Sequence, residues 1–368
     1  MLGIGFDSGG SRTTYALDLG GGPQLREGNE SAVSLADARG AAAASAAIEW
    51  MVDVIKNQSD DDIVAWIGAA GFSAASAPAI QARFREPLRA LAAELEEEGR
   101  RCEVFIANDA VSLLKAPPLL GTGMAAVVGT GSVVIGAHPK CPTGVVQRGG
   151  YEWLVSDEGS AVWMTLQCVR MVLRDIQARG SQDYHSVLLE RLADFLGIPV
   201  EATLHIPLSH RALARADLVA RRISESRPDA KRWYASFAYP HIFDLATRQP
   251  GSPYDPLAAE VLRSSVEVIA ESVRMVSDEL AAYTADEPNL REPLALIVGG
   301  KIAAHAQYNQ QLQSTIAGTC RFVSSVTAIG DGATSFAALA ARYLASDRRR
   351  KAQIAQAVDP LHPIYRLL

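Results

Sequence analysis

The sequence predicts an α/β protein of two related domains with a cleft between them, and three observations support this. Strand-like apolar runs alternate with helix-like segments along most of the chain, which is typical of α/β proteins. Residues 6–19 (FDSGGSRTTYALDL) and 124–138 (MAAVVGTGSVVIGAH) share one pattern, in which a Gly- and hydroxyl-rich turn joins two apolar runs. The 368 residues also exceed the roughly 150 of a usual domain.

The composition predicts a folded protein with a small-molecule partner. Hydrophobic residues make up 48% and charged residues 21%, which supplies a core. The net charge is −6 and the basic residues are dispersed apart from 348–351, which argues against nucleic acid as the main partner. We find neither a membrane helix nor a secretory signal in the sequence. We therefore expect a cytoplasmic protein whose four well-separated cysteines are reduced thiols.

The first hundred residues read as three strands, a helix, a strand, a helix and a final strand. Turn signals separate the early strands, and Ala-rich apolar spacing predicts the first helix. The strands are expected at 2–6, 13–19, 24–33, 62–72 and 102–109, and the helices at 35–56 and 77–99.

The second half reads as mainly helical beyond residue 157. Helices are expected at 158–179, 181–196, 209–226 and about 256–284, followed by strand–turn–helix units at 292–305 and 320–345. We place one domain at 1–116 and a larger one with a helical insertion at 117–345, with 346–368 packing back on the first domain.

The turn in FDSGGSRT is either a plain hairpin turn or a phosphate site. It is no Walker loop, because it lacks Gly-Lys-Ser/Thr and a strand follows it. The backbone amides of Gly9 and Gly10 can approach an anion, and Ser11 and Thr13 add hydroxyl donors. Asp7 would repel a bare phosphate but suits Mg²⁺ that carries phosphate oxygens, so the turn points to Mg-ATP rather than to free phosphate.

Two aspartates are candidates for work on a substrate hydroxyl. Asp109 ends a predicted strand, where α/β folds place ligands, and phosphoryl transfer needs a carboxylate to accept the proton of the hydroxyl. A helix N-cap is the alternative role for Asp109. Asp157 precedes the segment GSAVWM and has the same two interpretations, a cap or a contact with substrate hydroxyls.

Two further glycine turns are candidate nucleotide contacts. The turn at 129–132 (GTGS) offers donors without an acid. Gly299 and Gly300 lie between a buried strand and a helix, where a base or an α-phosphate can approach the backbone. A simple strand-to-helix turn is an equal interpretation of the last pair.

In this order, the motifs FDSGGSRT, ANDA, VVGTGS, SDEGSA and IVGG resemble the BadF/BadG/BcrA/BcrD ATPase and N-acetylglucosamine kinase family, within the superfamily of sugar kinases, actin and heat-shock ATPases. The resemblance covers nearly the whole chain, and residues 157–161 are its most specific part. It implies two ribonuclease-H-like domains that close over Mg-ATP and a sugar, commonly in a homodimer.

The resemblance also assigns site residues. Asp7 looks like the acidic residue near the metal and Asp109 like the catalytic base, which also touches the sugar. The nucleotide contacts that it implies, or that the first hairpin adds, are Gly9, Gly10, Ser11, Thr13, Thr130, Gly131, Gly299 and Gly300. The implied sugar-binding positions are Asn29, Gly150 and Asp157.

One stretch departs from the family pattern. Amino-sugar kinases of the family usually read Gly-Gly-Trp-Gly-His before the DEGS motif, whereas this chain reads Gly149-Gly150-Tyr151-Glu152-Trp153. We count the last three residues as candidate substrate contacts. An added carboxylate and indole favour a cationic amino group, as in glucosamine, or else reject an N-acetyl group and admit another polyol such as a cyclitol.

These features predict an ATP-dependent kinase of an amino sugar of the glucosamine or N-acetylglucosamine type, with a related polyol or cyclitol as the alternative acceptor. A second class is an ATPase that activates a reductase through an iron–sulfur cluster, against which the scattered cysteines speak. A third is a nucleotide-dependent sugar sensor without turnover, which the retained Asp109 disfavours.

Overall fold

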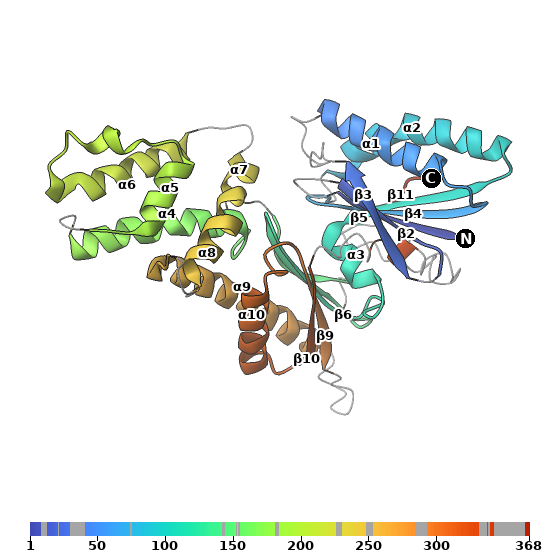
Figure 1. Cartoon of the computed structure of the whole chain (residues 1–368). Coiled ribbons are helices and arrows are strands. Elements are labelled where there is room, and N and C mark those ends of the chain that lie inside the picture. The colour runs from blue at the N-terminus through green and yellow to red at the C-terminus, as the bar shows by residue number, and fades with distance from the viewer. Residues whose placement is uncertain are drawn as a thin grey trace.

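Two mixed β-sheets form the centres of the two halves of the chain (Figure 1). The first sheet contains β1 (Leu2–Ser8), β2 (Thr13–Asp18), β3 (Pro23–Asn29), β4 (Asp62–Ala69), β5 (Arg101–Asn108) and β11 (Tyr365–Arg366). The second contains β6 (Gly123–Val128), β7 (Ser132–Ala137), β8 (Val146–Gly149), β9 (Leu294–Gly299) and β10 (Val323–Gly330). This computed structural model describes residues 1–8, 13–20, 22–29, 41–73, 76–141, 144–151, 153, 155–180, 184–225, 230–247, 253–283, 293–330, 337, 339–341 and 365–368.

The two sheets share one topology. Their strand orders are β11-β5-β4-β1-β2-β3 and β10-β9-β6-β7-β8. In each sheet three consecutive strands pair antiparallel, and two later strands add in parallel beside the first. The repeated motif of the sequence is therefore the first hairpin of each sheet.

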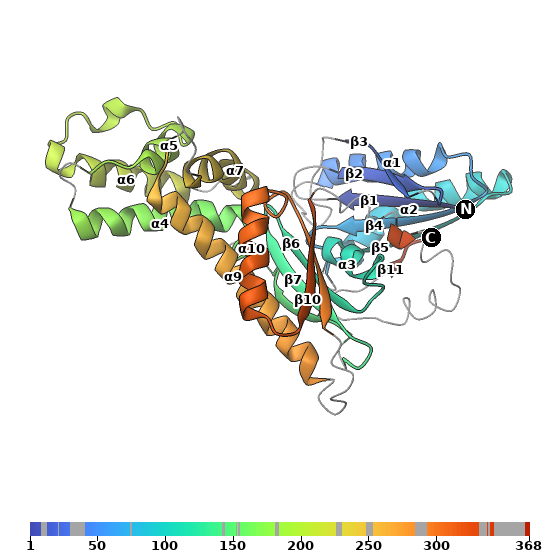
Figure 2. The same cartoon turned by 60° about the horizontal axis from the view of Figure 1, so that its bottom comes forward.

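Helices and sheets alternate in layers (Figure 2). The first half carries α1 (Ala41–Lys56), α2 (Ala77–Glu97) and α3 (Asp109–Lys115). The second half carries α4 (Ala161–Arg179), α5 (Val187–Phe195), α6 (Leu208–Ser224), α7 (Ala230–Phe237), α8 (Phe243–Ala246), α9 (Pro256–Ala282) and α10 (Ala306–Thr319), with single turns at Val200–Thr203 and Ala238–Ile242.

The helix α3 lies between the two sheets and joins them. Its buried Leu113 shares one apolar cluster with Trp66 of β4, Ile135 of β7 and Ile297 of β9. The helical residue Ala340 belongs to the same cluster. The face of the first sheet that is turned away from α3 is covered by α1 and α2, and the corresponding face of the second sheet by α9 and α10. Each sheet is therefore covered on both faces, as its apolar strands require.

The helices α4 to α8 form a lobe on the second half of the chain, to the left in Figure 1. Both views place α7 on the side of this lobe nearest the first sheet. Aromatic rings hold α7 in the lobe: Trp233 stacks on Phe195 at 4.9 Å between ring centroids, and Phe237 lies 5.2 Å from the same ring.

Several boundaries differ from the sequence-based expectation. The strand expected to end at Asp109 ends at Asn108, and Asp109 instead begins α3. The helix expected from 181 begins at Val187, because Ser186 caps it by accepting a hydrogen bond from the Leu189 amide. The segment before α1 that was expected to be helical lies outside the described residues, and the short elements α7, α8, β8 and β11 were not predicted. Within the described part of the chain, no helix is long and apolar enough to cross a membrane.

Candidate functional site

Asp109 lies at the start of α3, at the edge of the first sheet that faces the second. The N-cap of α3 is Asn108, whose side chain accepts a hydrogen bond from the Ala110 amide at 3.1 Å and donates one to the Phe72 carbonyl at 3.3 Å. Asp109 also accepts from the Ala110 amide, through Oδ1 at 2.9 Å. Gly68 leaves room for α3, since a Cβ there would lie only 2.5 Å from the Ser112 hydroxyl oxygen. Capping does not require Asp109, because the Asn108 side chain already accepts from the Ala110 amide.

The surroundings of Asp109 act on its ionisation in opposite directions. Burial raises the pKa of its carboxyl above the usual value, while the Ala110 amide and the Lys231 ammonium lower that pKa, and the Asp157 carboxylate raises it again. A base must be ionised to accept a proton, so the positive charge of Lys231 favours the state in which Asp109 can act.

Asp157 lies opposite, in the turn that precedes α4 on the second half of the chain. Ser160, rather than Asp157, caps α4 by accepting a hydrogen bond from the Trp163 amide at 3.2 Å. The Ser132 hydroxyl donates to the Glu158 carbonyl at 2.7 Å, which ties this turn to the 129–132 turn. The Asp157 side chain is only 4% exposed, and a Cβ added at Gly131 would overlap its Oδ2. Gly131 is therefore required for the position of this carboxylate.

Lys231 of α7, which was not predicted from the sequence, is the third charged residue of the cluster. Its Nζ lies 3.2 Å from Oδ2 of Asp157. No signal in the sequence separates Lys231 from Arg232, which is exposed on the same short helix. The structure thus gathers Asp109 of the first half, Asp157 of the second half and Lys231 of the helical lobe.

The first hairpin contributes Asp7 to the same edge. Asp7 pairs with Gly68 across β1 and β4, and paired residues on neighbouring strands point to the same face of a sheet. Since Gly68 faces α3, the Asp7 side chain is directed to the α3 side as well. Thr13 is on the opposite face, where it is buried and its hydroxyl donates to the Ser8 hydroxyl at 3.3 Å. Gly9, Gly10 and Ser11 lie outside the described residues.

The two glycine turns of the second sheet lie side by side. A Cβ at Gly129 would meet only the Lys301 amide nitrogen, at 3.9 Å, so the backbone of this turn is open to approach. Gly300 has φ +103°, and a Cβ there would lie 2.7 Å from the Val128 carbonyl carbon. The Val128 carbonyl also accepts a hydrogen bond from the Ile302 amide, at 3.1 Å. The helix expected directly after Gly299 and Gly300 begins only at Ala306.

Of the remaining predicted site positions, the structure describes some fully and others in part or not at all. Gly150, with φ +74°, packs against Val133, and the exposed Tyr151 donates its amide to the Ser156 hydroxyl at 3.0 Å. Trp153 packs against α7, with its ring centroid 6.0 Å from that of Tyr234. Asn29 is the last residue of β3 and pairs with Thr13, but the structure does not describe its side chain. Glu152 lies outside the described residues. Thr130 lies, half-buried, between Gly129 and Gly131.

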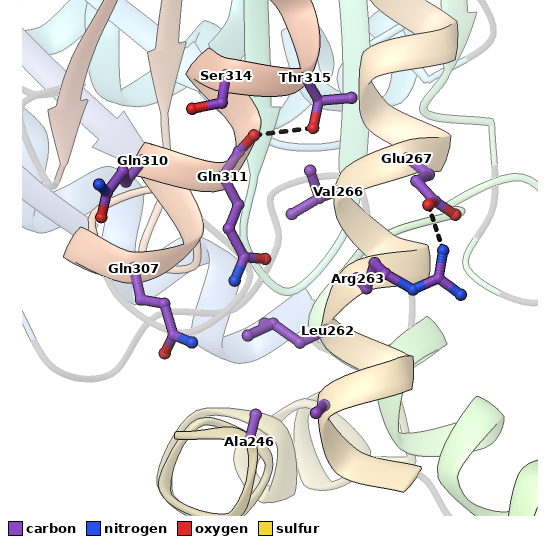
Figure 3. Close-up of a pocket in the computed structure, with 11 residues that line it drawn as sticks. Ala246, Leu262, Arg263, Val266, Glu267, Gln307, Gln310, Gln311, Ser314 and Thr315 are labelled. Carbon is purple, nitrogen blue, oxygen red and sulfur yellow. Dashed lines mark hydrogen bonds and ion pairs between the residues drawn. The ribbon is translucent and has the colours of Figure 1, made fainter. Parts of the chain in front are cut away.

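Two other features lie away from this cluster. A groove between α9 and α10, bounded by Ala246 of α8, is lined by Gln307, Gln311 and Arg263 among others, and contains none of the predicted site residues (Figure 3). None of the four cysteines, all of which the structure describes, forms a disulfide, and three of them are buried. Burial raises the pKa of the Cys102 thiol to about 12 and raises that of Cys168 as well. No group of three or more potential metal ligands occurs among the His, Cys, Asp and Glu side chains that the structure describes.

Comparison with known proteins places this geometry in a known fold. Neither a family model nor a curated protein matches the chain. A solved structure from Porphyromonas gingivalis, provisionally named an N-acetylglucosamine kinase, is similar with a TM-score of 0.58 at 16% identity, over 94% of this chain and 99% of that one. A protein from Chromobacterium violaceum with the same provisional name matches over 92% of this chain and 98% of its own, at 19% identity and a TM-score of 0.48. The Porphyromonas similarity and the duplicated sheet topology confirm the two-domain, ribonuclease-H-like α/β fold, whereas no family model supports the narrower BadF/BadG resemblance.

Proposed function

We propose that this chain is an ATP-dependent kinase that phosphorylates a hydroxyl group of a sugar or a related polyol. The observation that carries the proposal is the approach of two carboxylates from opposite halves of the fold, Asp109 and Asp157, beside the glycine turn at Gly131. The fold supports it, because the Porphyromonas structure bears the name of a sugar kinase. Candidate acceptors are amino sugars of the glucosamine or N-acetylglucosamine type and neutral polyols such as cyclitols.

The described residues fit Mg-ATP as the second substrate. Asp7 is directed to the α3 side of the first sheet and can hold Mg²⁺ directly or through water. The open backbone at Gly129, beside the Lys301 amide, can approach phosphate oxygens that a side chain would exclude. When bound, Mg-ATP supplies the phosphoryl group, and the cation offsets charge on its oxygens.

The two aspartates have different roles in the proposed reaction. Asp109 takes the proton of the acceptor hydroxyl at Oδ2, since Oδ1 is occupied by the Ala110 amide. The acceptor oxygen then bonds to the γ-phosphorus, the bond from that phosphorus to the β–γ bridging oxygen breaks, and ADP leaves. Asp157 accepts hydrogen bonds from neighbouring hydroxyls and fixes the orientation of the acceptor, so that its contribution is one of position.

A screen of acceptor-dependent ADP release tests the proposal. The panel contains glucosamine, N-acetylglucosamine, N-acetylmuramic acid, glucose and cyclitols. At least one acceptor should stimulate ADP release and appear as a phosphorylated product. A flat response across the panel contradicts the proposal, and binding of a sugar without ADP release instead identifies a sensor.

The Asp109→Asn variant tests the assigned base. It preserves shape and should bind nucleotide like the wild type, while its turnover falls by about 10²–10⁴-fold. Turnover within about tenfold of the wild type would exclude Asp109 as the base.

The homodimer remains a prediction that mass measurement in solution can check.

A further inference from the structure

Lys231 lies where the acceptor of the proposed reaction would bind. Its ammonium is 3.2 Å from Oδ2 of Asp157 and would be 3.4 Å from a Cβ added at Gly131. The Lys231 side chain is 43% exposed whereas that of Asp157 is 4% exposed, so the lysine covers the carboxylate and remains within reach of a ligand. The lysine therefore lies beside the buried carboxylate and presents its charge to a ligand that binds there.

The position of Lys231 follows from the packing of α7. The Thr165 hydroxyl of α4 donates to the Tyr234 carbonyl at 2.8 Å, and the Tyr234 hydroxyl donates to the Ile223 carbonyl of α6. Trp153, from the segment before α4, packs on the Tyr234 ring. Residues three apart lie on one side of a helix, so Lys231 shares the anchored side of α7 with Tyr234. A lysine on a helix held in this way is a fixed part of the site.

Lys231 provides the positive charge in this cluster. The charged side chains that act on Asp109 among the described residues are Lys231 of α7 and Asp157 before α4. Asp7, near the end of β1, is directed to the side of the first sheet on which α3 lies. A cationic acceptor would have to place its ammonium beside Asp157, where Lys231 already is, whereas hydroxyl groups can donate to the carboxylate without opposing that charge.

We propose that Lys231 sets the charge of the acceptor site, favouring a neutral acceptor over one that carries an ammonium group. This inference rests on the proposed function and narrows its substrate class to neutral sugars and polyols. It assigns the preference for a neutral acceptor to the helical lobe. Of the two alternatives drawn from Glu152 and Trp153, it opposes the one in which a cationic amino group is favoured and agrees with the one in which a neutral polyol is admitted. Lys231 acts here as a specificity-determining residue that also lowers the pKa of Asp109.

The test compares glucose with glucosamine at a pH where the amine is protonated, since the two differ by one hydroxyl-to-ammonium exchange. Lys231→Met should raise the ratio of kcat/KM for glucosamine to that for glucose by about tenfold, the effect of one unit charge at short range in a partly solvated site. Lys231→Arg should restore the wild-type ratio. Arg232→Met removes the same charge from an exposed position on α7 and should leave the ratio within about twofold of wild type.

A pH profile supplies a second readout that a merely structural lysine would not change. Without the ammonium, the pKa of Asp109 rises, so the acid limb of kcat/KM should move to higher pH in Lys231→Met and stay in place in Arg232→Met. If both variants show the same ratio and the same limb, the inference is wrong. If the wild-type protein transfers no phosphoryl group to either sugar, the proposed function is refuted instead. The preference of the site is then measured without turnover, as the ratio of the calorimetric binding constants for glucosamine and glucose. Failure to bind either sugar overturns both.

Discussion

Adding one methyl group at Gly131 tests whether the 129–132 turn holds Asp157 in place. A Cβ at Gly131 would overlap Oδ2 of Asp157, and atoms in contact lie about 3.5 Å apart, so the carboxylate has to move by about 1 Å. The displaced group is the end of a side chain, and Gly131 has an ordinary negative φ, so the fold can absorb the change. The contact of Asp157 with Lys231 at 3.2 Å would be lost, as would the hydrogen bonds to the acceptor that we propose for Asp157. A hydrogen bond to a charged group is worth about 1.5–3 kcal/mol, and acceptor affinity should therefore fall by about 10- to 150-fold.

The assay for Gly131→Ala measures acceptor and nucleotide binding separately. We expect the KM and the calorimetric dissociation constant of the acceptor to rise, with the unfolding midpoint close to that of wild type. Gly129→Ala is the matched control, because its Cβ would meet only the Lys301 amide nitrogen at 3.9 Å, an ordinary contact, and acceptor affinity should persist. The reasoning is refuted if Gly131→Ala binds the acceptor as tightly as Gly129→Ala does.

Two further predictions concern stability. Gly300→Ala should lower the free energy of unfolding by about 3 kcal/mol, from a positive φ and the lost hydrogen bonds at the Val128 carbonyl. Gly197→Ala, with φ +66° and nothing within 4 Å of the added Cβ, should lose only about 1 kcal/mol, and urea unfolding that fails to separate the two variants would contradict the close approach at Gly300. Asp109→Asn should be more stable than wild type at pH 7, because burial raises the folded-state pKa of Asp109 and its ionised form therefore destabilises the fold. This advantage should shrink as pH falls through the raised pKa toward the unfolded value of 3.8, and an advantage that does not change with pH would mean that ionisation of Asp109 is not its cause.

The sequence predicted what depends on local pattern and missed what depends on tertiary contact. The two hairpins were visible because strand alternation and glycine turns are local signals, and Asp109 and Asp157 stood out at the ends of such segments. The choice between cap and functional acid was not decidable from the sequence, because Asn108 and Ser160 beside them can cap equally well. The face to which the Thr13 hydroxyl points could not be predicted from the sequence, since it follows from the pairing of Thr13 with Ser8. Lys231 could not be found because α7 has only eight residues and meets Asp157 through long-range packing.

The duplicated topology explains why the helical lobe has to contribute to the site. Two halves built on one plan each contribute an acid, Asp109 from the first and Asp157 from the second, and the Asp157 carboxylate raises the pKa of Asp109. The compensating charge comes from α7, which follows α4 and has no counterpart in the first half of the chain. The sheets and their glycine turns can serve any phosphoryl transfer from Mg-ATP, whereas the charge beside Asp157 depends on which residue α7 presents. Acceptor preference should therefore change with substitutions of Lys231 in α7 and of Trp153, which packs on α7. Substitutions in the glycine turns should instead change nucleotide affinity, except at Gly131, where the turn supports Asp157 directly.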